Sequence, residues 1–588
     1  MNPDQSDSRA KVAGAIWKSR GPLEPSNETI PTDIPRLVWD VMCARGYKTV
    51  DAIQKWLNPS LKNLRDPYTL FDMDKAIARL VQARENQESL VIYADYDLDG
   101  TSGLALLLKA FEWMGFEKVG YYQPKRLSEG YGLHNAAIQK LYDQGFRLLM
   151  SVDLGITAIG EVAFAKSLGM DSIITDHHLP KERLPDAVAV VNPNRGNCPS
   201  NLSHLCGTGV AFYLVLALKR ALLEQGLMKP EQDFDPKDLL DCFVIGTVTD
   251  MVPLVDENRI LVKHGLLQLA QTKRPGLRVL MQALGLWGHP LTSSDVAIRF
   301  APKLNALSRM EMGILPIDLY LVDDEKKAQA LVETVLSNNQ DRQASQRSAE
   351  TEAFELYRAN PKKSSIFVYS KNFHRGVVGL VATKLCQEFG LPAFVGSLIE
   401  ESGQIVGSAR MPEGRGLNAL DAMSTANDEL DQFGGHAVAA GFELELKHAK
   451  AFGEKLETFF SGKAVEAASR IWLYDAEATL AELSPQFMQW YEVLSPFGAQ
   501  FSAPVFCIKG VKLSKVKELK GGHYRLTLGD ASISRTALWF SPPKGHPGIE
   551  VVKSPGSARV DVLVEPQWNY FNGQRSLQFL VSDLRGAC

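Results

Sequence analysis

Three aspartates crowd together at Asp95, Asp97 and Asp99, directly after the apolar run 89–94. Carboxylates this close repel one another unless cations lie between them. A calcium loop of the helix–loop–helix type is excluded, because it needs Glu at its twelfth position, where this chain has Leu106. Taken alone, the spacing indicates either a cation site or a solvated acidic loop.

Three later segments repeat this pattern, in which residues that can bind a metal follow a short apolar run. They are Asp153 after 146–152, Asp176-His177-His178 after 172–175, and Asp250 after 243–245. Each alone could be a helix cap or a hydrogen-bonded turn, but four strand ends at one edge of an open α/β sheet would form a site. The set is rich in oxygen, includes imidazole and lacks thiolate, so it suits Mn²⁺ or Mg²⁺ better than structural zinc. Two such ions bridged by a carboxylate would generate a hydroxide for phosphoryl displacement.

The surrounding pattern predicts the elements that must position these residues. Alternating strands and helices predict a parallel sheet; the strands are 89–94, 146–152 and 172–175, and the helices are 103–114 and 157–168. The polar stretch 323–358 keeps helical spacing and predicts one long connecting helix, with two shorter helices broken near 337–339 as the alternative. A second α/β unit is expected from 365 to about 462, followed by an all-β domain.

Charge is distributed unevenly along the 588 residues, whose net charge is −4. Residues 505–588 hold twelve Lys and Arg against six Asp and Glu, a net of +6, so residues 1–504 carry −10. Six aromatic residues interleave with these cations: Tyr524, Trp539, Phe540, Trp568, Tyr570 and Phe571. Cations and aromatics on a β-barrel are typical of a single-strand binding platform, although about half of these rings are expected in the core.

The composition excludes a largely disordered chain, a collagen-like chain and a chain held together by disulfides. Hydrophobic residues at 45% and charged residues at 22% are typical of a globular chain of three or four domains. Seven dispersed Cys residues without a C-x-x-C pair favour free thiols in a reducing compartment. We expect a cytoplasmic protein without a signal peptide or membrane span, because the longest apolar run, 209–218, is too short to cross a bilayer.

As an ordered set, these motifs resemble the DHH phosphoesterase superfamily and, within it, bacterial single-strand-specific 5′→3′ exonucleases. The resemblance covers about residue 50 to the C-terminus. Three segments are similar to the DHHA1 domain that accompanies the DHH domain. The supporting segments are 95–100, 124–133, 176–178, 246–254 and 302–309, and for DHHA1 they are 374–382, 407–410 and 434–441.

The resemblance implies roles for individual residues. Metal ligands are expected at Asp97, Asp99, Asp153, His177 and Asp250. Asp95 and His178 complete the catalytic cluster as a ligand, a group that supports a ligand, or a proton donor. Contacts with substrate are expected at Arg126, Asn305, Arg309, Ser408, Arg410 and His436. The residues themselves add Trp568 and Tyr570, because the segment 568–573 resembles a hairpin turn that would expose its rings. Planar guanidinium groups suit phosphate oxygens, and the glycine-rich loop 434–441 would let backbone N–H groups approach a phosphate. The alternatives are a solvated surface strand for Ser408 and Arg410, and a packed core histidine for His436.

The resemblance also implies an architecture of two α/β lobes, DHH and DHHA1, joined by a long helix and followed by an OB-fold domain. The expected segments are an N-terminal arm (1–50), DHH (51–322), the connecting helix (323–360), DHHA1 (361–462) and the OB-fold (463–588). Such a chain would be a Mn²⁺- or Mg²⁺-dependent exonuclease of single-stranded DNA in repair and recombination. It would be a monomer whose partners include a helicase and a single-strand-binding protein. The rival hypotheses are a phosphodiesterase of short oligonucleotides or cyclic dinucleotides, and a non-catalytic DNA-binding replication scaffold.

Overall fold

The computed structural model describes residues 15–21, 28–126, 128–229, 232–310, 313–412, 414–461, 463, 471–530, 533–543, 545–554, 559–571 and 574–587. The chain forms two compact units, residues 63–467 and residues 1–62 together with 468–588. None of the described helices combines the length and the apolar composition that a membrane crossing requires.

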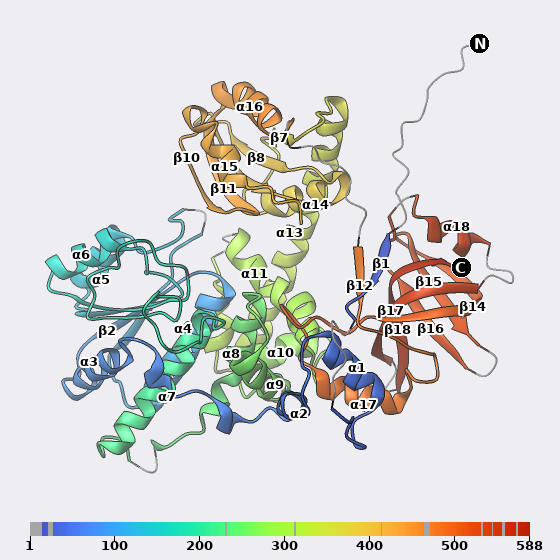
Figure 1. The fold of residues 1–588 in the computed structure, drawn as a ribbon. Helices are drawn as coiled ribbons and strands as arrows, with labels where there is room; N and C mark the ends of the chain where they lie inside the picture. The colour runs from blue at the N-terminus through green and yellow to red at the C-terminus, as the bar shows by residue number, and fades with distance from the viewer. Residues whose placement is uncertain are drawn as a thin grey trace. The chain divides into compact units, whose positions relative to one another are not determined.

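The first lobe of residues 63–467 is built on a parallel sheet, drawn in blue to cyan in Figure 1. Its five strands follow the order β3-β2-β4-β5-β6. Its strands are β2 (Leu90–Ala94), β3 (Val119–Tyr122), β4 (Leu148–Val152), β5 (Asp171–Thr175) and β6 (Ala189–Val191). Strands β2 and β4 are buried along their whole length, as central strands covered on both faces must be. The predicted parallel sheet and its three predicted strands are confirmed.

Helices cover both faces of this sheet. Helices α5 (Asn135–Asp143) and α6 (Ile159–Ser167) pack on one face, and the opposite face carries α3 (Met73–Glu85), α4 (Leu98–Trp113) and α7 (Gly207–Glu224). Helix α4 begins at Leu98, before the start at 103 that the sequence predicts. It begins early because the Asp97 carboxylate accepts the N–H groups of Asp99 (2.8 Å) and Gly100 (3.1 Å) and so caps the helix.

A helical layer completes this lobe. It contains α8 (Leu240–Thr249), α9 (Asp256–Ala270), α10 (Pro275–Ala283), a π-helical turn (Asp295–Phe300), α11 (Ala301–Met310) and α12 (Pro316–Leu321). The prediction that Asp250 follows a strand is wrong, because the apolar run 243–245 lies inside helix α8 and Asp250 is its C-terminal cap. Helix α8 is buried between α4 and α9, and a short run that is apolar on every side does not distinguish a buried helix from a buried strand.

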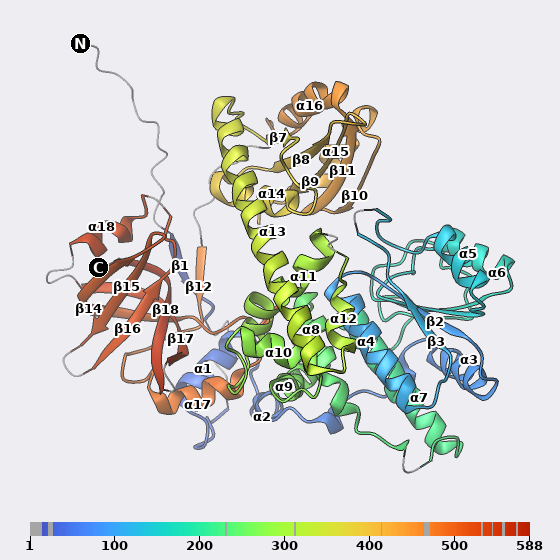
Figure 2. The ribbon, with the colours of Figure 1, turned by 180° about the vertical axis from the view of Figure 1, so that it is seen from behind.

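One continuous helix, α13 (Glu325–Ala359), connects the two lobes of this unit (Figure 2). The Asp324 carboxylate caps its first turn by accepting the N–H of Lys327 at 2.9 Å. Its first half packs on α10 and α11, and its second half packs on α14 (Val378–Phe389) and β7 (Ile366–Ser370). Asn338 and Asn339 are buried within the helix, so the alternative of two helices broken near 337–339 is not observed.

The second lobe holds a five-stranded sheet in the order β10-β11-β9-β8-β7, in which only β7 and β8 are parallel. The remaining elements are β8 (Ala393–Ile399), β9 (Gln404–Arg410), α15 (Ala419–Ser424), β10 (Gln432–His436), β11 (Ala439–Glu445) and α16 (Ala449–Ser461). Phe394, Phe442 and Phe452 dominate its core. The glycine-rich segment 434–441 is predicted to be a loop, but most of it lies in the paired strands β10 and β11, where Gly434 faces Gly441.

The other unit contains a closed β-barrel, in which β14 pairs with both β15 and β17. Its elements are β13 (Ala476–Glu477), β14 (Phe506–Leu519), β15 (His523–Gly529), β16 (Ser534–Trp539), α18 (Pro547–Lys553), β17 (Arg559–Phe571) and β18 (Gln574–Gly586). The predicted all-β C-terminal domain is confirmed.

The described N-terminal residues belong to the same unit as the barrel, which the sequence pattern did not indicate. Strand β1 (Ile16–Ser19) pairs in parallel with β12 (Ile471–Tyr474). Helix α1 (Arg36–Ala44) contacts β13, and α2 (Val50–Leu57) contacts α17 (Pro485–Leu494). The Arg45 guanidinium binds both carboxylate oxygens of Asp475, with Nε at 2.7 Å and Nη2 at 3.0 Å. This buried ion pair joins the C-terminal end of α1 to the segment between β12 and β13.

Candidate metal centre and phosphate site

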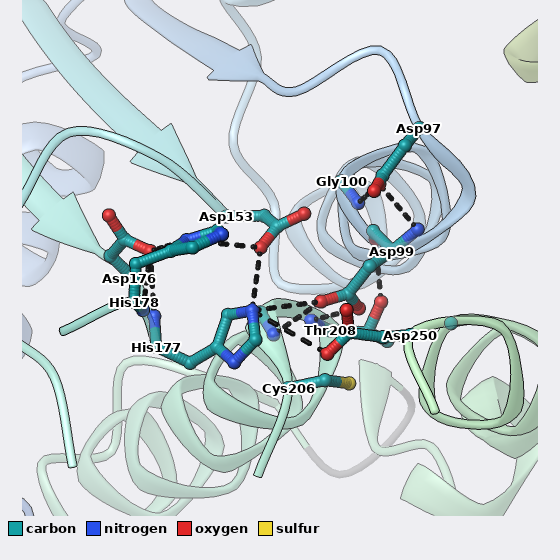
Figure 3. A network of polar contacts seen from close by, with 12 residues as sticks. Asp97, Asp99, Gly100, Asp153, Asp176, His177, His178, Cys206, Thr208 and Asp250 are labelled. Atoms are coloured by element: carbon teal, nitrogen blue, oxygen red, sulfur yellow. Dashed lines mark hydrogen bonds and ion pairs between the residues drawn. The ribbon is translucent and has the colours of Figure 1, made fainter. Parts of the chain in front are cut away.

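The first turn of α4 and the first turn of α7 meet at Asp99 (Figure 3). The N–H groups of Gly207 and Thr208 donate to its two carboxylate oxygens, at 2.6 and 2.8 Å. The Thr208 hydroxyl donates to the Asp99 carbonyl at 2.7 Å. The N-terminus of α7 therefore orients this carboxylate, which belongs to the first turn of α4, and the helix dipole also favours the placement.

Three glycines allow the acidic residues to approach the backbone this closely. A Cβ at Gly207 would lie 2.5 Å from the Asp153 Cβ, and one at Gly246 would lie 2.2 Å from the Thr208 Oγ1. A Cβ at Gly100 would lie 2.5 Å from the Asp95 carbonyl oxygen. Any larger residue at these positions would push the carboxylates apart, which explains the glycines at 100 and 246 in two of the sequence motifs.

The His177 side chain lies at the centre of the cluster, and three carboxylates converge on its Nε2 atom (Figure 3). The distances are 3.1 Å to Asp153, 3.6 Å to Asp250 and 3.8 Å to Asp99. Burial lowers the pKa of His177, so the imidazole is neutral near pH 7 and can donate its lone pair to a metal.

His178 is held differently from its neighbour. Its Nδ1–H donates to the Asp176 carboxylate at 2.8 Å, and its ring edge lies against Tyr131, with ring centroids 5.8 Å apart. Burial opposes protonation, but the hydrogen bond to Asp176 prevails and raises the pKa of His178 to about 9. In the metal-free chain, the hydrogen bond to Asp176 therefore favours the protonated form of His178.

The other carboxyl groups of the cluster lie close together and are buried or half-buried, so their negative charges are not neutralised by neighbouring protein groups. Burial, together with the neighbouring carboxylates, raises the pKa of Asp95, Asp97 and Asp153 above the ordinary range and raises that of Asp250 to about 8. Protons or cations must balance this charge. Within the cluster, four buried atoms have no hydrogen-bond partner among the described residues: Asp95 Oδ1, Asp153 Oδ1, His177 Nε2 and Asp250 Oδ2.

These atoms fall into groups that could each hold a divalent cation. Asp95, Asp97 and Asp153 form one group, with ligand atoms all within 4.8 Å of one another. Asp99, His177 and Asp250 form a second group, and Asp153 also lies within this distance of His177 and His178. The structure thus brings together all seven residues of the predicted catalytic cluster, in an oxygen-rich arrangement that fits Mn²⁺ or Mg²⁺.

Arginines that the sequence assigns to phosphate gather within the same unit. Arg126 lies over the Tyr96 ring, with its guanidinium carbon 5.2 Å from the ring centroid, and Arg309 ends helix α11 with Nη1 3.5 Å from the Gly376 carbonyl. Burial and the charges of Arg126, Arg342 and Arg410 lower the pKa of Arg309 to about 10. Within the described part of the chain, no carboxylate pairs with any of these four arginines, so the cluster is suited to an anion.

Ser408 and Arg410 lie on β9, beside the first turn of helix α14. A Cβ at Gly379 would lie 3.1 Å from the Arg410 Nη2 and 3.4 Å from the Ser408 Oγ. Neither Val378 nor Gly379 donates its backbone N–H to any described residue, and such free groups at a helix N-terminus attract anions. Arg410 is half-buried and its pKa is lowered by burial, so the alternative of a fully solvated surface strand is not observed.

The other two predicted substrate contacts of this unit lie on neighbouring elements. Asn305 is half-buried on α11, one turn before Arg309. His436 is exposed at the end of β10, so it is not a packed core histidine.

The barrel exposes only some of its predicted aromatic platform. Tyr524 and Trp539 are buried, whereas Phe540 is 54% exposed and Tyr570 is 40% exposed. The half-buried Trp568 donates its indole N–H to Glu492 at 2.6 Å, and the Arg575 guanidinium lies over its ring at 4.6 Å. The Phe571 side chain lies outside the described residues.

Sequence reasoning missed two residues that the structure places beside these sites. Asp176 was quoted only as part of a motif, but its carboxylate orients His178. Arg342 lies on α13, and its charge lowers the pKa of both Arg309 and Lys303. Only a prediction of which face of α13 packs on α11 could have found Arg342.

Three family models match the chain in order. They are the DHH family N-terminal domain over residues 89–247, the DHHA1 domain over 362–462 and the RecJ OB domain over 474–583.

Curated proteins and solved structures are similar over most of the chain. The single-stranded-DNA-specific exonuclease RecJ of Bacillus subtilis is 31% identical, over 94% of this chain and 68% of that protein. Its counterpart from Salmonella typhimurium is 30% identical, over 94% of this chain and 96% of that protein. The crystal structure of RecJ in complex with Mn²⁺ from Thermus thermophilus is 26% identical, with a TM-score of 0.78, over 98% of this chain and 80% of that one.

Proposed function

Because the chain belongs to the RecJ family of single-stranded-DNA-specific exonucleases, we propose that it degrades single-stranded DNA from the 5′ end to 5′-mononucleotides in DNA repair and recombination. The observation that carries the proposal is the buried cluster of Asp95, Asp153, His177 and Asp250, each with an unpartnered atom within reach of other ligands. The 5′→3′ polarity rests on the family resemblance.

The residues at this cluster fit two divalent cations, Mn²⁺ or Mg²⁺, which RecJ of Thermus thermophilus binds in its crystal structures. Asp97, Asp99, Asp153, His177 and Asp250 would hold them, and Asp95 would complete the group. Such ions supply Lewis acidity and acidify a water molecule, which is the chemistry that phosphodiester hydrolysis needs. The chain contributes fixed ligand positions, because Asp99 is already oriented by two backbone N–H groups.

His178 is the proposed proton donor. Asp176 stabilises its charged form and raises its pKa to about 9 in the metal-free chain. An imidazolium beside the metal cluster could bind a phosphoryl oxygen or protonate the leaving 3′ oxygen. Asp176 would then act by orienting the ring and maintaining its charge.

The proposed terminal-phosphate site is formed by Arg126, Arg309, Arg410 and Ser408, with the free N–H groups at the start of α14. Its support is the absence, within the described residues, of any carboxylate paired with these arginines. Guanidinium groups that bind the 5′ phosphate would anchor the strand end and orient the next phosphodiester towards the metal centre. Asn305 and His436 remain proposed contacts at its edge.

The barrel is proposed to hold the strand farther from the reacting end. Its exposed Phe540 and Tyr570 rings offer stacking surfaces, and its excess of cations would attract the phosphate backbone. We also propose a cytoplasmic monomer that depends on a helicase to open duplex DNA and on a single-strand-binding protein to present the strand.

A metal-titrated assay on single-stranded DNA, duplex DNA and RNA tests this proposal. The expected result is mononucleotide release from single-stranded DNA that depends on Mn²⁺ or Mg²⁺ and is abolished by EDTA, with little degradation of blunt duplex. Equal activity without metal, or activity limited to di- and trinucleotides, would contradict it.

A further inference from the structure

The peptide backbone of the His177-His178 pair is bound on all sides by side chains. On the donor side, the Asp176 carboxylate accepts the N–H of His177 at 2.7 Å and that of His178 at 3.1 Å. On the acceptor side, the Asn194 carboxamide donates to the His177 carbonyl, and the Asn192 carboxamide donates to the His178 carbonyl at 2.9 Å. No polar backbone group of the pair therefore depends on water or on a regular strand partner.

The two asparagines form one unit at the end of β6. The Asn194 N–H donates to the Asn192 side-chain oxygen at 2.7 Å, which closes a turn between them. Asn192 is fully buried and directly follows Val191, whose carbonyl accepts the N–H of Asp176 at 3.2 Å. The turn is thus anchored on the strand that neighbours β5, from which the histidine pair extends.

This arrangement fixes the backbone of the histidine pair at a place where the sheet does not. The histidine pair lies beyond the last paired residue of β5, where the sheet no longer fixes the backbone. The direction of the backbone there decides where both imidazoles project, and His177 Nε2 must lie close to three carboxylates. Side-chain hydrogen bonds to both carbonyls replace the missing ladder bonds.

We propose that Asn192 and Asn194 are positioning residues of the metal centre, which hold the backbone of His177 and His178 so that the site is preorganised for divalent cations. This inference rests on the proposed function, since it assumes that the cluster binds metal. Residues that support metal ligands through hydrogen bonds typically contribute ~10–100-fold to metal affinity. The side-chain hydrogen bonds of the two asparagines go to the carbonyls of the histidine pair and to each other, so both residues would act through the histidines.

Calorimetric titration of Mn²⁺ into Asn194→Ala and Asn192→Ala tests the proposal. Both variants are expected to bind Mn²⁺ about 10–100-fold more weakly than the unmodified chain. In activity assays kcat should fall, while KM for single-stranded DNA should stay unchanged. Asn194 is only half-buried, so Asn194→Ala carries the test if the buried Asn192→Ala fails to fold.

Asn418→Ala is the matched control. Asn418 forms the same type of turn, accepting the N–H of Leu420 at 2.9 Å, but it lies in the second lobe at the start of α15. The Asn418→Ala variant should bind Mn²⁺ with the same affinity as the unmodified chain. If the folded Asn194→Ala variant also keeps the unmodified affinity, the positioning role is refuted. If the unmodified chain itself binds no Mn²⁺, the metal centre of the proposed function fails instead.

Discussion

The metal centre and the barrel solve the problem of binding a polyanion in opposite ways. At the metal centre, buried carboxylates are held by backbone N–H groups and packed against glycines, so their positions are set before any ligand arrives. On the barrel, cations such as Lys515 and Lys517 are exposed on β14. The rings of Phe540, just after β16, and of Tyr570, on β17, are exposed as well. Chemistry at one phosphate needs fixed geometry, whereas holding a strand of any sequence needs only charge and stacking surface.

The largest expected effect comes from replacing Asp153 at the centre of the cluster. Asp153→Ala should reduce kcat by roughly 10³-fold or more, because the residue is shared between the proposed ligand groups. Binding of single-stranded DNA should change less than about threefold, since the barrel and the phosphate site remain. Rate assays at saturating Mn²⁺ and fluorescence anisotropy would measure the two quantities.

Asp143→Ala is the control for Asp153→Ala, because Asp143 is exposed on α5 of the same lobe. It should leave kcat unchanged. Unchanged activity in a folded Asp153→Ala protein would show that the buried cluster is not the site of hydrolysis.

Arg309→Ala should produce the next largest effect. Charge-assisted hydrogen bonds to a phosphate contribute about 1.5–3 kcal/mol, so KM for a 5′-phosphorylated strand should rise roughly 10–100-fold. A strand with a 5′-hydroxyl end should be affected much less. The control is Arg278→Ala, which removes a guanidinium that already pairs with Glu325 at 3.3 Å. Equal losses on both substrates would mean that Arg309 does not recognise the terminal phosphate.

Removing the exposed rings of the barrel should have a smaller effect. Stacking contributes about 1–3 kcal/mol per base, so even at the lower limit for each ring the double change Phe540→Ala and Tyr570→Ala should weaken binding of a long strand about 30-fold, with kcat unchanged. Tyr68→Ala removes an exposed ring of the other unit and serves as the control. Unaltered affinity in the double variant would place the stacking surface elsewhere.

The smallest expected effect is the pH dependence of the free energy of unfolding when the centre holds no metal. The folded chain holds the Asp250 pKa at about 8, whereas the unfolded chain has the ordinary value of 3.8. Between these values the folded state binds more protons than the unfolded state, so the free energy of unfolding falls as pH rises from about 4 to about 8. A cation that replaces the proton should therefore stabilise the chain more at high pH.

Thermal unfolding at pH 6 and pH 8, with and without Mn²⁺, checks this expectation. The increase in melting temperature caused by Mn²⁺ should be ~2–5 °C larger at pH 8. Asp250→Asn, which imitates the protonated carboxyl, should lose most of this difference. Equal increases at both pH values would refute the assignment of the excess charge to this cluster.

The sequence pattern predicted the parts of the fold that depend on local periodicity. Strands β2, β4 and β5, the continuous helix α13 and the all-β barrel are confirmed. Asp250 shows the limit, because a fully buried apolar run does not reveal whether it is a helix or a strand. Glycine is unfavourable inside helices and strands, so its presence in a sequence indicates a loop. For this reason the start of α4 was predicted too late, and the segment 434–441 was predicted to be a loop.

The candidate site likewise has features that the sequence reveals and features that only the folded chain reveals. Its ligand types and their order along the chain were visible in the motifs, although the individual roles stay predictions. Asn192, Asn194 and Arg342 were not visible, because their importance depends on which backbone or helix face they meet in the folded chain. The pairing of Arg45 with Asp475 was likewise beyond any local pattern, since these residues are far apart in the sequence.

Digestion of a long single strand labelled at its 5′ end tests the central claim most directly. With Mn²⁺ present, the account predicts that the label appears as a mononucleotide from the earliest times, while the rest of the strand shortens from that end. Release of the label only from very short oligomers, or as longer fragments, would contradict an exonuclease that starts at the 5′ phosphate.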